Sequence, residues 1–295
     1  MRGILPSLLV LAVAGLTARA TTSCSAFDAS EPGLADAGNP SDADPPSGEA
    51  GAGPDSGADA RPAAAALELD GVDDYATLPP GSYLAGAFTF ELWFRLRAVP
   101  TSTDQARAMT LLSLTSADTD CEDVYLGFGS GVAAATKLVF QVDATGGCPA
   151  RDTNPLQYSP PGGWVKDRWY HVAAVREGGG ATVLYVDAES VGARPTSGNL
   201  LATSLGVSIG RWPSQVPAEL ASFQGSIDEL RLYNRALAFG EVAARWANGA
   251  GTYGHAESGL LAGYHFDGTG DAFTSGSPAV SLRGASFADG LVQPP

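Results

Sequence analysis

Two glutamates in strand-like runs are the carboxylates to check for acid–base hydrolysis, although the sequence assigns no catalytic residue. Glu91 and Glu229 each lie in a run of alternating apolar and polar side chains. Glycoside hydrolysis needs two carboxyl groups about 5–10 Å apart across a groove, so these two would have to face one another. The chain contains no G-x-S-x-G, H-E-x-x-H or phosphate-loop pattern. His171 and His265 also lie in strand-like runs, where a structural role is favoured.

A second group of carboxylates could bind a metal ion. Asp70, Asp73 and Asp74 cluster beside Gly71, which predicts a turn rich in oxygen atoms. Calcium binds about six to eight oxygens, several of which are commonly backbone carbonyls. The turn is therefore a candidate calcium site.

Asp228 is the second predicted calcium ligand. Strand alternation places it on the same face as Leu230 and Leu232. A carboxylate on an apolar face must be paired, hydrogen-bonded or bound to metal. We predict a structural Ca²⁺ held by Asp73 and Asp228; the alternative is that Asp228 accepts backbone hydrogen bonds from the turn at Gly71.

Three aromatic residues are candidates for ligand binding because they lie in segments rich in Pro and Gly. They are Tyr158, Trp164 and Trp212. Loops commonly carry binding residues, and an exposed aromatic ring can stack on a sugar. The alternative is that these side chains close the ends of the fold.

The N-terminal region predicts export. Residues 4–16 are apolar and uncharged after a short basic start, and Ala18-Arg19-Ala20 resembles a signal-peptidase site. The following Thr-Thr-Ser-Cys ending at Cys24 resembles a lipoprotein box, which would make Cys24 a lipidated first residue; simple cleavage and secretion is the alternative. We assign residues 1–23 to a signal peptide and 24–63 to a disordered acidic linker of mainly Ala, Gly, Pro, Ser and Asp.

The number of cysteines is consistent with an exported protein. The chain has three cysteines. Lipidation of Cys24 leaves Cys121 and Cys148, which flank neighbouring strand-like runs and could form a disulfide. An oxidising compartment favours that bridge over two free thiols.

Net charge narrows the class of partner. The formal net charge is -15, and only 17 of 295 residues are Lys or Arg. A chain this acidic repels phosphate backbones, which argues against nucleic-acid binding. Neutral sugars, divalent cations and other proteins remain possible partners, and membrane contact is expected only through the lipid anchor.

From residue 64 onward the pattern predicts an all-β fold. Residues 88–96 alternate: Phe88, Phe90, Leu92, Phe94 and Leu96 share one face, and Glu91, Trp93 and Arg95 share the other. Many short runs of this kind, separated by Gly-rich turns, are typical of a β-sandwich or jelly roll. Residues 239–248 form the one convincing helix, with Gly249 as its stop signal.

Several segments resemble one family in the same order. They are the opening segment 67–75, the FTFELWF strand at 88–94, the Trp169-Tyr170-His171-Val172-Ala173 strand, the Leu184-Tyr185-Val186-Asp187 strand, Ile209-Gly210-Arg211, and the block at 223–237 followed by the helix. Together they resemble the LamG-like, concanavalin A-like lectin/glucanase superfamily. The resemblance implies a two-sheet antiparallel jelly-roll β-sandwich over residues 64–295. It also implies that the first and last strands lie near each other, where a Ca²⁺ can be held.

The same family includes glycosidases. Those of the laminarinase branch carry an E-x-D-x-x-E pattern on one strand, and residues 68–73 approach it with Asp73 in the last position and Gly71 breaking the strand. The pattern is not met. We therefore expect a non-catalytic, exported, monomeric binding module for a polysaccharide or a surface protein; the alternatives are a glycoside hydrolase and a purely structural envelope protein.

The sequence allows two structural roles for the C-terminal segment. Residues 260–270 resemble a segment that often precedes such a domain, although here it comes last. It either completes the same sandwich or begins another repeat. About 35 residues are too few to form a sandwich alone, which favours completion.

Overall fold

A computed structural model describes residues 64–84, 86–101, 109–116, 119–130, 133–143, 154–196, 205–212, 222–249 and 257–290. The predicted signal peptide, the linker, Cys24 and Cys148 lie outside these residues, as does the side chain of Cys121, so lipidation and the disulfide stay predictions. Within the described part of the chain, no helix has the length and apolar character needed to cross a bilayer.

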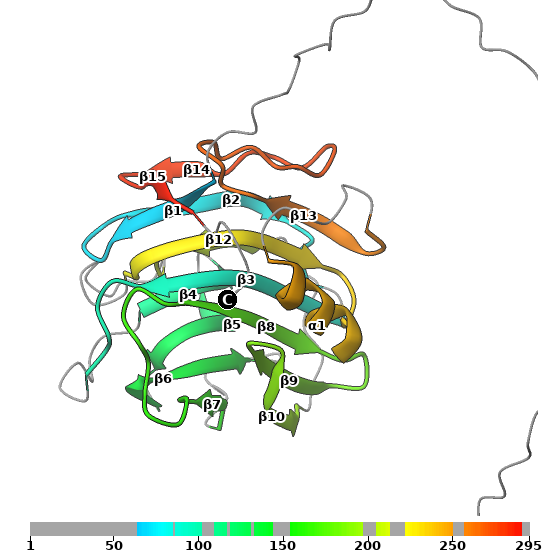
Figure 1. Ribbon diagram of the computed structural model, residues 1–295. Helices are drawn as coiled ribbons and strands as arrows, with labels where there is room; N and C mark the ends of the chain where they lie inside the picture. Colours follow the sequence, from blue (N-terminus) through cyan, green and yellow to red (C-terminus); the bar gives the residue numbers. More distant parts are fainter. Residues whose placement is uncertain are drawn as a thin grey trace, which may run out of the picture. The chain divides into compact units, whose positions relative to one another are not determined.

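Two antiparallel sheets form the fold (Figure 1). Sheet A runs in the order β10 (Glu189–Pro195), β9 (Ala181–Val186), β8 (Trp169–Arg176), β3 (Phe88–Leu96), β12 (Gln224–Tyr233), β1 (Ala65–Asp70) and β15 (Ser286–Asp289), with β13 (Leu260–Tyr264) also paired to β12. Sheet B runs in the order β14 (Ser281–Arg283), β2 (Tyr75–Gly81), β11 (Leu205–Ile209), β4 (Met109–Ser116), β5 (Thr119–Ser130), β6 (Ala133–Val142) and β7 (Leu156–Tyr158). The predicted two-sheet jelly roll is confirmed.

The C-terminal segment belongs to both sheets. β13 pairs with β12 and β15 pairs with β1 in sheet A, while β14 pairs with β2 in sheet B. The segment therefore extends the sandwich on both layers.

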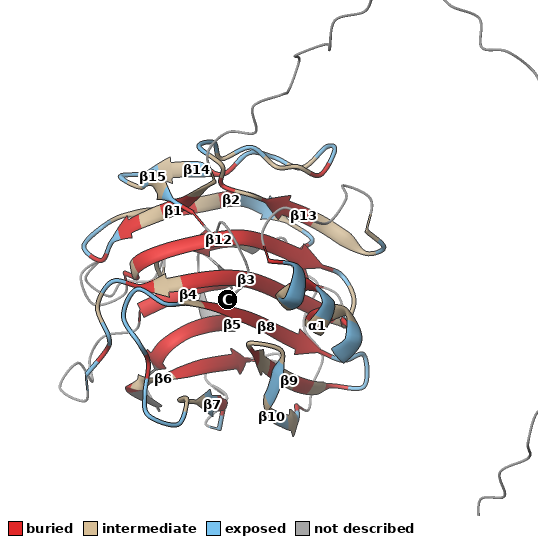
Figure 2. Cartoon of the chain, in the orientation of Figure 1, coloured by how far each residue is buried: buried red, intermediate tan, exposed pale blue. Residues whose placement is uncertain are grey.

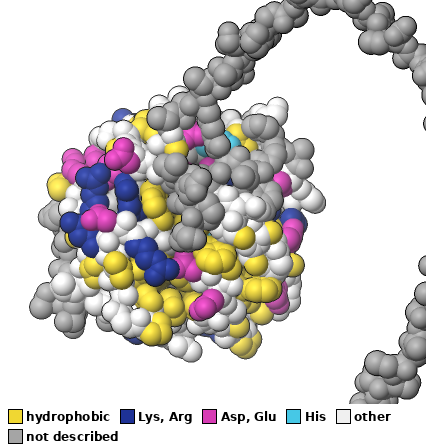
Figure 3. All heavy atoms as spheres, in the orientation of Figure 1, with side chains coloured by type: hydrophobic (Ala, Val, Ile, Leu, Met, Phe, Trp, Pro, Cys, Tyr) yellow, Lys and Arg dark blue, Asp and Glu magenta, His cyan; other side chains and the backbone are white. Residues whose placement is uncertain are grey.

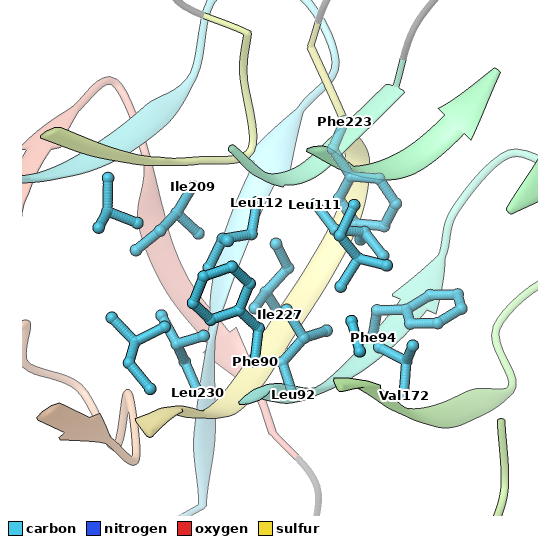
Figure 4. Close-up of a cluster of buried hydrophobic side chains, with 14 of the residues drawn as sticks. Phe90, Leu92, Phe94, Leu111, Leu112, Val172, Ile209, Phe223, Ile227 and Leu230 are labelled. Atoms are coloured by element: carbon cyan, nitrogen blue, oxygen red, sulfur yellow. The ribbon is translucent and has the colours of Figure 1, made fainter. Parts of the chain in front are cut away.

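Alternating side chains fill the space between the sheets. Phe90, Leu92 and Phe94 of β3 meet Leu112 of β4 and Ile209 of β11 in one apolar cluster (Figure 4). The central strands β12, β3 and β8 are buried along almost their whole length (Figure 2). The predicted division of β3 into an inner apolar face and an outer face with Glu91 is confirmed, since the apolar set lies in the core.

Helix α1 (Phe239–Asn248) spans the predicted range and packs on the outer face of sheet A. Glu241 stabilises its first turn, because its carboxylate accepts the Ala238 backbone N–H at 2.8 Å and pairs with Arg235 at 2.6 Å. The hydrogen bond from Arg235 lowers the pKa of Glu241 to about 2. Val242 anchors the helix in an apolar contact with Ala173, and Gly249 ends it at a positive φ of 62°.

A bulge in β12 overturns one expectation. Glu229 has a φ of 51°, and the pairing register with β3 shifts between Asp228 and Arg231. The core therefore contains Ile227 and Leu230, and Asp228, which pairs with Trp93, lies on the outer face. The prediction that Asp228 shares a face with Leu230 was wrong because simple alternation does not survive an inserted residue.

Candidate functional site

The outer face of sheet A carries a row of polar and aromatic side chains at one end. Cross-strand pairing aligns Glu68 with Ser226, Ser226 with Arg95, and Arg95 with Trp169. We call these four residues the Trp169 row. They come from β1, β12, β3 and β8, so the row crosses the middle of the sheet.

Hydrogen bonds hold the row in place. Ser226 donates to Glu68 Oε2 at 2.9 Å and accepts from Arg95 Nε and Nη2 at 3.3 and 3.1 Å. The Arg95 guanidinium lies 4.9 Å from the Trp169 ring centroid, a cation–π contact. Arg97 pairs with Glu68 at 2.6 Å. Trp169 and Arg95 remain partly exposed, so the row offers a partly exposed ring beside fixed donors and acceptors.

A chain of alternating basic and acidic side chains occupies the other end of the same face, beneath and beside α1. We call it the charge chain. From one end to the other it comprises His171, Glu91, Arg245, Glu257, Arg231, Glu229 and His265. It joins β8, β3, α1, β12 and the segment around β13 through side chains.

Glu91 sits in the first half of the charge chain. Its Oε1 is 2.8 Å from His171 Nε2, and its Oε2 is 3.3 Å from Arg245 Nε. Arg245 also contacts Glu257, which accepts the Tyr233 hydroxyl at 2.7 Å. The Glu91 side chain is 1% exposed, so no substrate reaches it in this conformation.

Glu229 sits in the second half. Arg231 Nη2 donates to its Oε2 at 2.8 Å, and His265 Nδ1 lies 2.9 Å from its Oε1. The Glu229 side chain is 2% exposed. The two strand-borne glutamates named as hydrolytic candidates are therefore each enclosed between a guanidinium and an imidazole.

The three aromatic candidates from loops lie away from the Trp169 row. Trp164 is 6% exposed, packs in the core beside Phe94 and Phe128, and donates its indole N–H to the Thr136 carbonyl at 3.0 Å. An indole enclosed in this way cannot stack on a sugar, so the structure contradicts the expectation for Trp164.

Tyr158 and Trp212 are partly buried. Tyr158 packs edge-on against Trp164 at 6.0 Å, and Trp212 leans on Tyr125 at 4.9 Å on the outer face of sheet B. The polar residues beside Tyr125 on that face, Ser113 and Gln141, are themselves buried. Among the described residues, the Trp169 row on sheet A is more exposed than Ser113, Tyr125 and Gln141 on the outer face of sheet B.

The carboxylates of the predicted calcium turn do come together. One oxygen from each of Asp70, Asp73 and Asp74 lies within 4.8 Å of the others. Asp70 Oδ1 accepts the Val72 N–H at 2.7 Å, and Asp74 Oδ2 accepts the Asp70 N–H at 3.0 Å, so part of this oxygen surface already closes the turn.

Asp228 is not part of this turn. Asp70 pairs with Gln224, and Asp228 lies four residues further along β12, about 13 Å away at the usual strand rise. Its Oδ1 accepts the Glu229 backbone N–H at 2.8 Å within the bulge. The structure therefore does not bring Asp73 and Asp228 together as ligands of one ion, and calcium binding at the turn stays a prediction.

Repulsion in this turn leads to a pH-dependent prediction. Burial, and then the charges of Asp70 and Asp73, raise the pKa of Asp74 above its ordinary value. The folded protein therefore holds this proton more tightly than the unfolded chain, and stability is lost as the pH rises through the raised pKa. We expect Asp74→Asn to stabilise the protein at pH 7 by at most about 1 kcal/mol, because the group is largely solvated.

Urea unfolding at pH 7 and pH 3 checks this expectation. The gain should vanish at pH 3, where the Asp74 carboxyl is mostly protonated in both states. Asp271→Asn, at an exposed aspartate outside the turn, is the control. A loss of stability at pH 7 in Asp74→Asn would contradict the prediction. A calcium titration of both proteins also tests the ion, since bound Ca²⁺ would cancel the repulsion in the wild type.

The sequence matches a family model over residues 70–243, described as the concanavalin A-like lectin/glucanases superfamily. The match covers more than half of the chain, including the strands that carry the Trp169 row and the charge chain. The chain belongs to this superfamily. No curated protein matches the chain in sequence.

Several solved structures resemble the chain at low sequence identity. A proposed carbohydrate-binding protein from Bacteroides ovatus is 18% identical with a TM-score of 0.56, over 79% of this chain and 62% of that protein. A pentraxin from Limulus polyphemus is 17% identical with a TM-score of 0.44, over 61% and 80% of the two chains. Domain 4 of an extracellular arabinanase from Geobacillus stearothermophilus, in complex with arabinotriose, is 18% identical with a TM-score of 0.43, over 61% and 75%.

Strand alternation could have identified Trp169 as an outward-facing residue, whereas the search for aromatic residues in loops missed it. Tyr170, Val172 and Ala174 alternate into the core, which leaves Trp169 and His171 on the outer face. Trp169 lies within the strand motif at 169–173 that resembles the concanavalin A-like superfamily. Its place at the start of β8, where the sheet meets solvent, is what exposes it.

Proposed function

We propose that this domain binds carbohydrate without hydrolysing it, and that the Trp169 row is the binding surface. The observation that carries the proposal is the partly exposed Trp169 ring beside hydrogen-bonding groups fixed in register across four strands. An aromatic face offers apolar area to a sugar ring, while fixed polar groups set its orientation. Membership of a superfamily that contains lectins supports the same function.

The charge chain supports the non-catalytic half of the proposal. A general acid and a nucleophile or base must both reach the scissile bond. Glu91 and Glu229 are almost fully buried, and each is bound to a basic side chain. Hydrolysis by this pair would require Glu91 to leave Arg245 and His171, and Glu229 to leave Arg231 and His265.

A glycan array probed with the full chain, run beside an assay for released reducing sugar, tests both halves. We expect retention on one class of glycan and no release. Release that disappears in Glu91→Gln or Glu229→Gln would overturn the non-catalytic half. An array without any bound glycan would overturn the binding half.

Trp169→Ala should weaken glycan binding at least tenfold, because the variant lacks the stacking surface. The fold should lose no more than about 1 kcal/mol, the usual contribution of an exposed cation–π contact. Binding is measured by isothermal titration calorimetry with a glycan retained on the array, and stability by thermal unfolding.

Phe239→Ala is the matched control, because Phe239 is an aromatic residue of α1 with 57% of its surface exposed. It should bind as the wild type does. Equal loss of binding in both variants, or unchanged binding in Trp169→Ala, would move the site away from the row.

The proposal also includes export and a lipid tether at Cys24, which would present the binding surface outside the cell. The apolar N-terminal stretch and the Thr-Thr-Ser-Cys sequence support it. Incorporation of labelled palmitate that is lost in Cys24→Ala is the expected result. An unlabelled wild-type protein released in soluble form would favour simple secretion instead.

A further inference from the structure

The Arg95 guanidinium has donors to spare at the centre of the Trp169 row. Nε and Nη2 donate to Ser226 Oγ, and Nη2 also donates to the Asp289 backbone carbonyl at 2.9 Å. An arginine has five N–H groups, and these contacts engage those on Nε and Nη2. The two on Nη1 have no acceptor among the described residues.

The acceptors that hold Arg95 are neutral. A hydroxyl and a backbone carbonyl fix the guanidinium without cancelling its charge. The arginines on either side differ: Arg97 pairs with Glu68 at 2.6 Å, and Arg168 pairs with Asp187 at 2.7 Å. Among these three arginines of the described residues, Arg95 is therefore the one whose guanidinium makes no direct ion pair with a carboxylate.

Charge is also distributed unevenly along the row. Glu68 and the turn containing Asp70 lie at the β1 end, whereas Lys166, Asp167 and Arg168 precede Trp169 in the chain at the β8 end. Three strand spacings, about 14 Å, separate β1 from β8. Figure 3 shows Lys and Arg side chains gathered beside Asp and Glu side chains at one side of the molecule. Lys166 pairs with Asp167 at 3.6 Å and Arg168 pairs with Asp187 at 2.7 Å, so the charge available to an anionic group over Trp169 is that of Arg95.

We propose that the saccharide bound at the Trp169 row carries an anionic group, a carboxylate or a sulfate, that accepts hydrogen bonds from Arg95 Nη1 while the sugar ring lies against Trp169. This inference rests on the proposed function and adds the ligand class. A guanidinium held in advance by Ser226 loses little side-chain freedom on binding, and charge-assisted hydrogen bonds are about twice as strong as neutral ones.

Matched pairs of ligands test the charge alone. The panel contains oligomers of galacturonate, mannuronate and glucuronate beside their methyl esters, and a sulfated galactan oligomer beside its desulfated form. We expect at least one acid to bind the full chain tenfold or more tightly than its neutral counterpart. Preference for uronates or for the sulfated oligomer distinguishes the two sources of charge.

Two arginine variants complete the test. Arg95→Gln should bring the charged and neutral members of a pair to equal affinity, while Arg283→Gln, an exposed arginine of sheet B, should leave the preference unchanged. Wild-type protein that binds each pair equally, or binds neutral glycans alone, overturns the anionic ligand and leaves glycan binding intact. Wild-type protein that binds no saccharide, charged or neutral, overturns the proposed function and this inference with it.

Discussion

Glu91→Ala is expected to lower the free energy of unfolding by about 3–5 kcal/mol, because it leaves Arg245 and His171 buried without their shared carboxylate. Both partners are almost fully buried, so water cannot replace the lost acceptor. For a domain of this size, the change corresponds to a fall in melting temperature of about 6–20 °C. Thermal and urea unfolding measure it.

Glu189→Ala provides the control, since Glu189 is an exposed glutamate of β10, and it should change stability by no more than about 0.5 kcal/mol. If Glu91→Ala is insoluble, Glu91→Gln is the second variant, because it keeps one acceptor oxygen for His171 or Arg245. A melting temperature within about 2 °C of the wild type in either Glu91 variant would show that the charge chain contributes little.

Trp164→Ala should cost a similar amount, about 3–5 kcal/mol, through the loss of buried apolar surface and the cavity left behind. The indole packs against Phe94, Phe128 and Tyr170, which lie on strands of both sheets. Its removal therefore leaves a cavity between the two sheets. If the fold is retained, glycan binding should not change, because Trp164 is outside the Trp169 row. Urea unfolding and the array used for the wild type check the two halves.

The neighbouring residue supplies a matched control. Val165 is 54% exposed, and Val165→Ala should be nearly neutral. Trp164→Phe should fall between the two, since it keeps a ring in the core but loses the hydrogen bond to Thr136. Weaker glycan binding by folded Trp164→Phe would restore Trp164 as a binding residue.

Features governed by periodicity could be predicted from the sequence. The inner face of β3 follows from strict alternation, and the ends of α1 follow from a short helical pattern with Gly249 as its stop. The two-sheet jelly roll follows from the resemblance to a known family, because alternation alone does not say which strands are neighbours.

The site was harder to predict, for two physical reasons. A bulge at Glu229 places Asp228 on the outer face of sheet A. A bulge is a change in backbone conformation that the residue types do not reveal. Exposure also depends on what covers a residue: Trp164 lies in a segment rich in Pro and Gly and is in the core, whereas Trp169 lies in a strand and is partly exposed. Neither outcome follows from local composition.

The pairing of β1 with β15 places the two ends of the domain together, and Gly290 donates a backbone hydrogen bond to the Ala64 carbonyl at 3.0 Å (Figure 1). The first strand can find its partners only after β12 and β15 have been synthesised, so folding should be slow and late relative to synthesis. A chain cut short before β15 would leave β1 as an open edge, ready to pair with another molecule. Conversely, a circular permutation that joins residues 64 and 290 should preserve the fold, because the new connection would bridge ends that already touch.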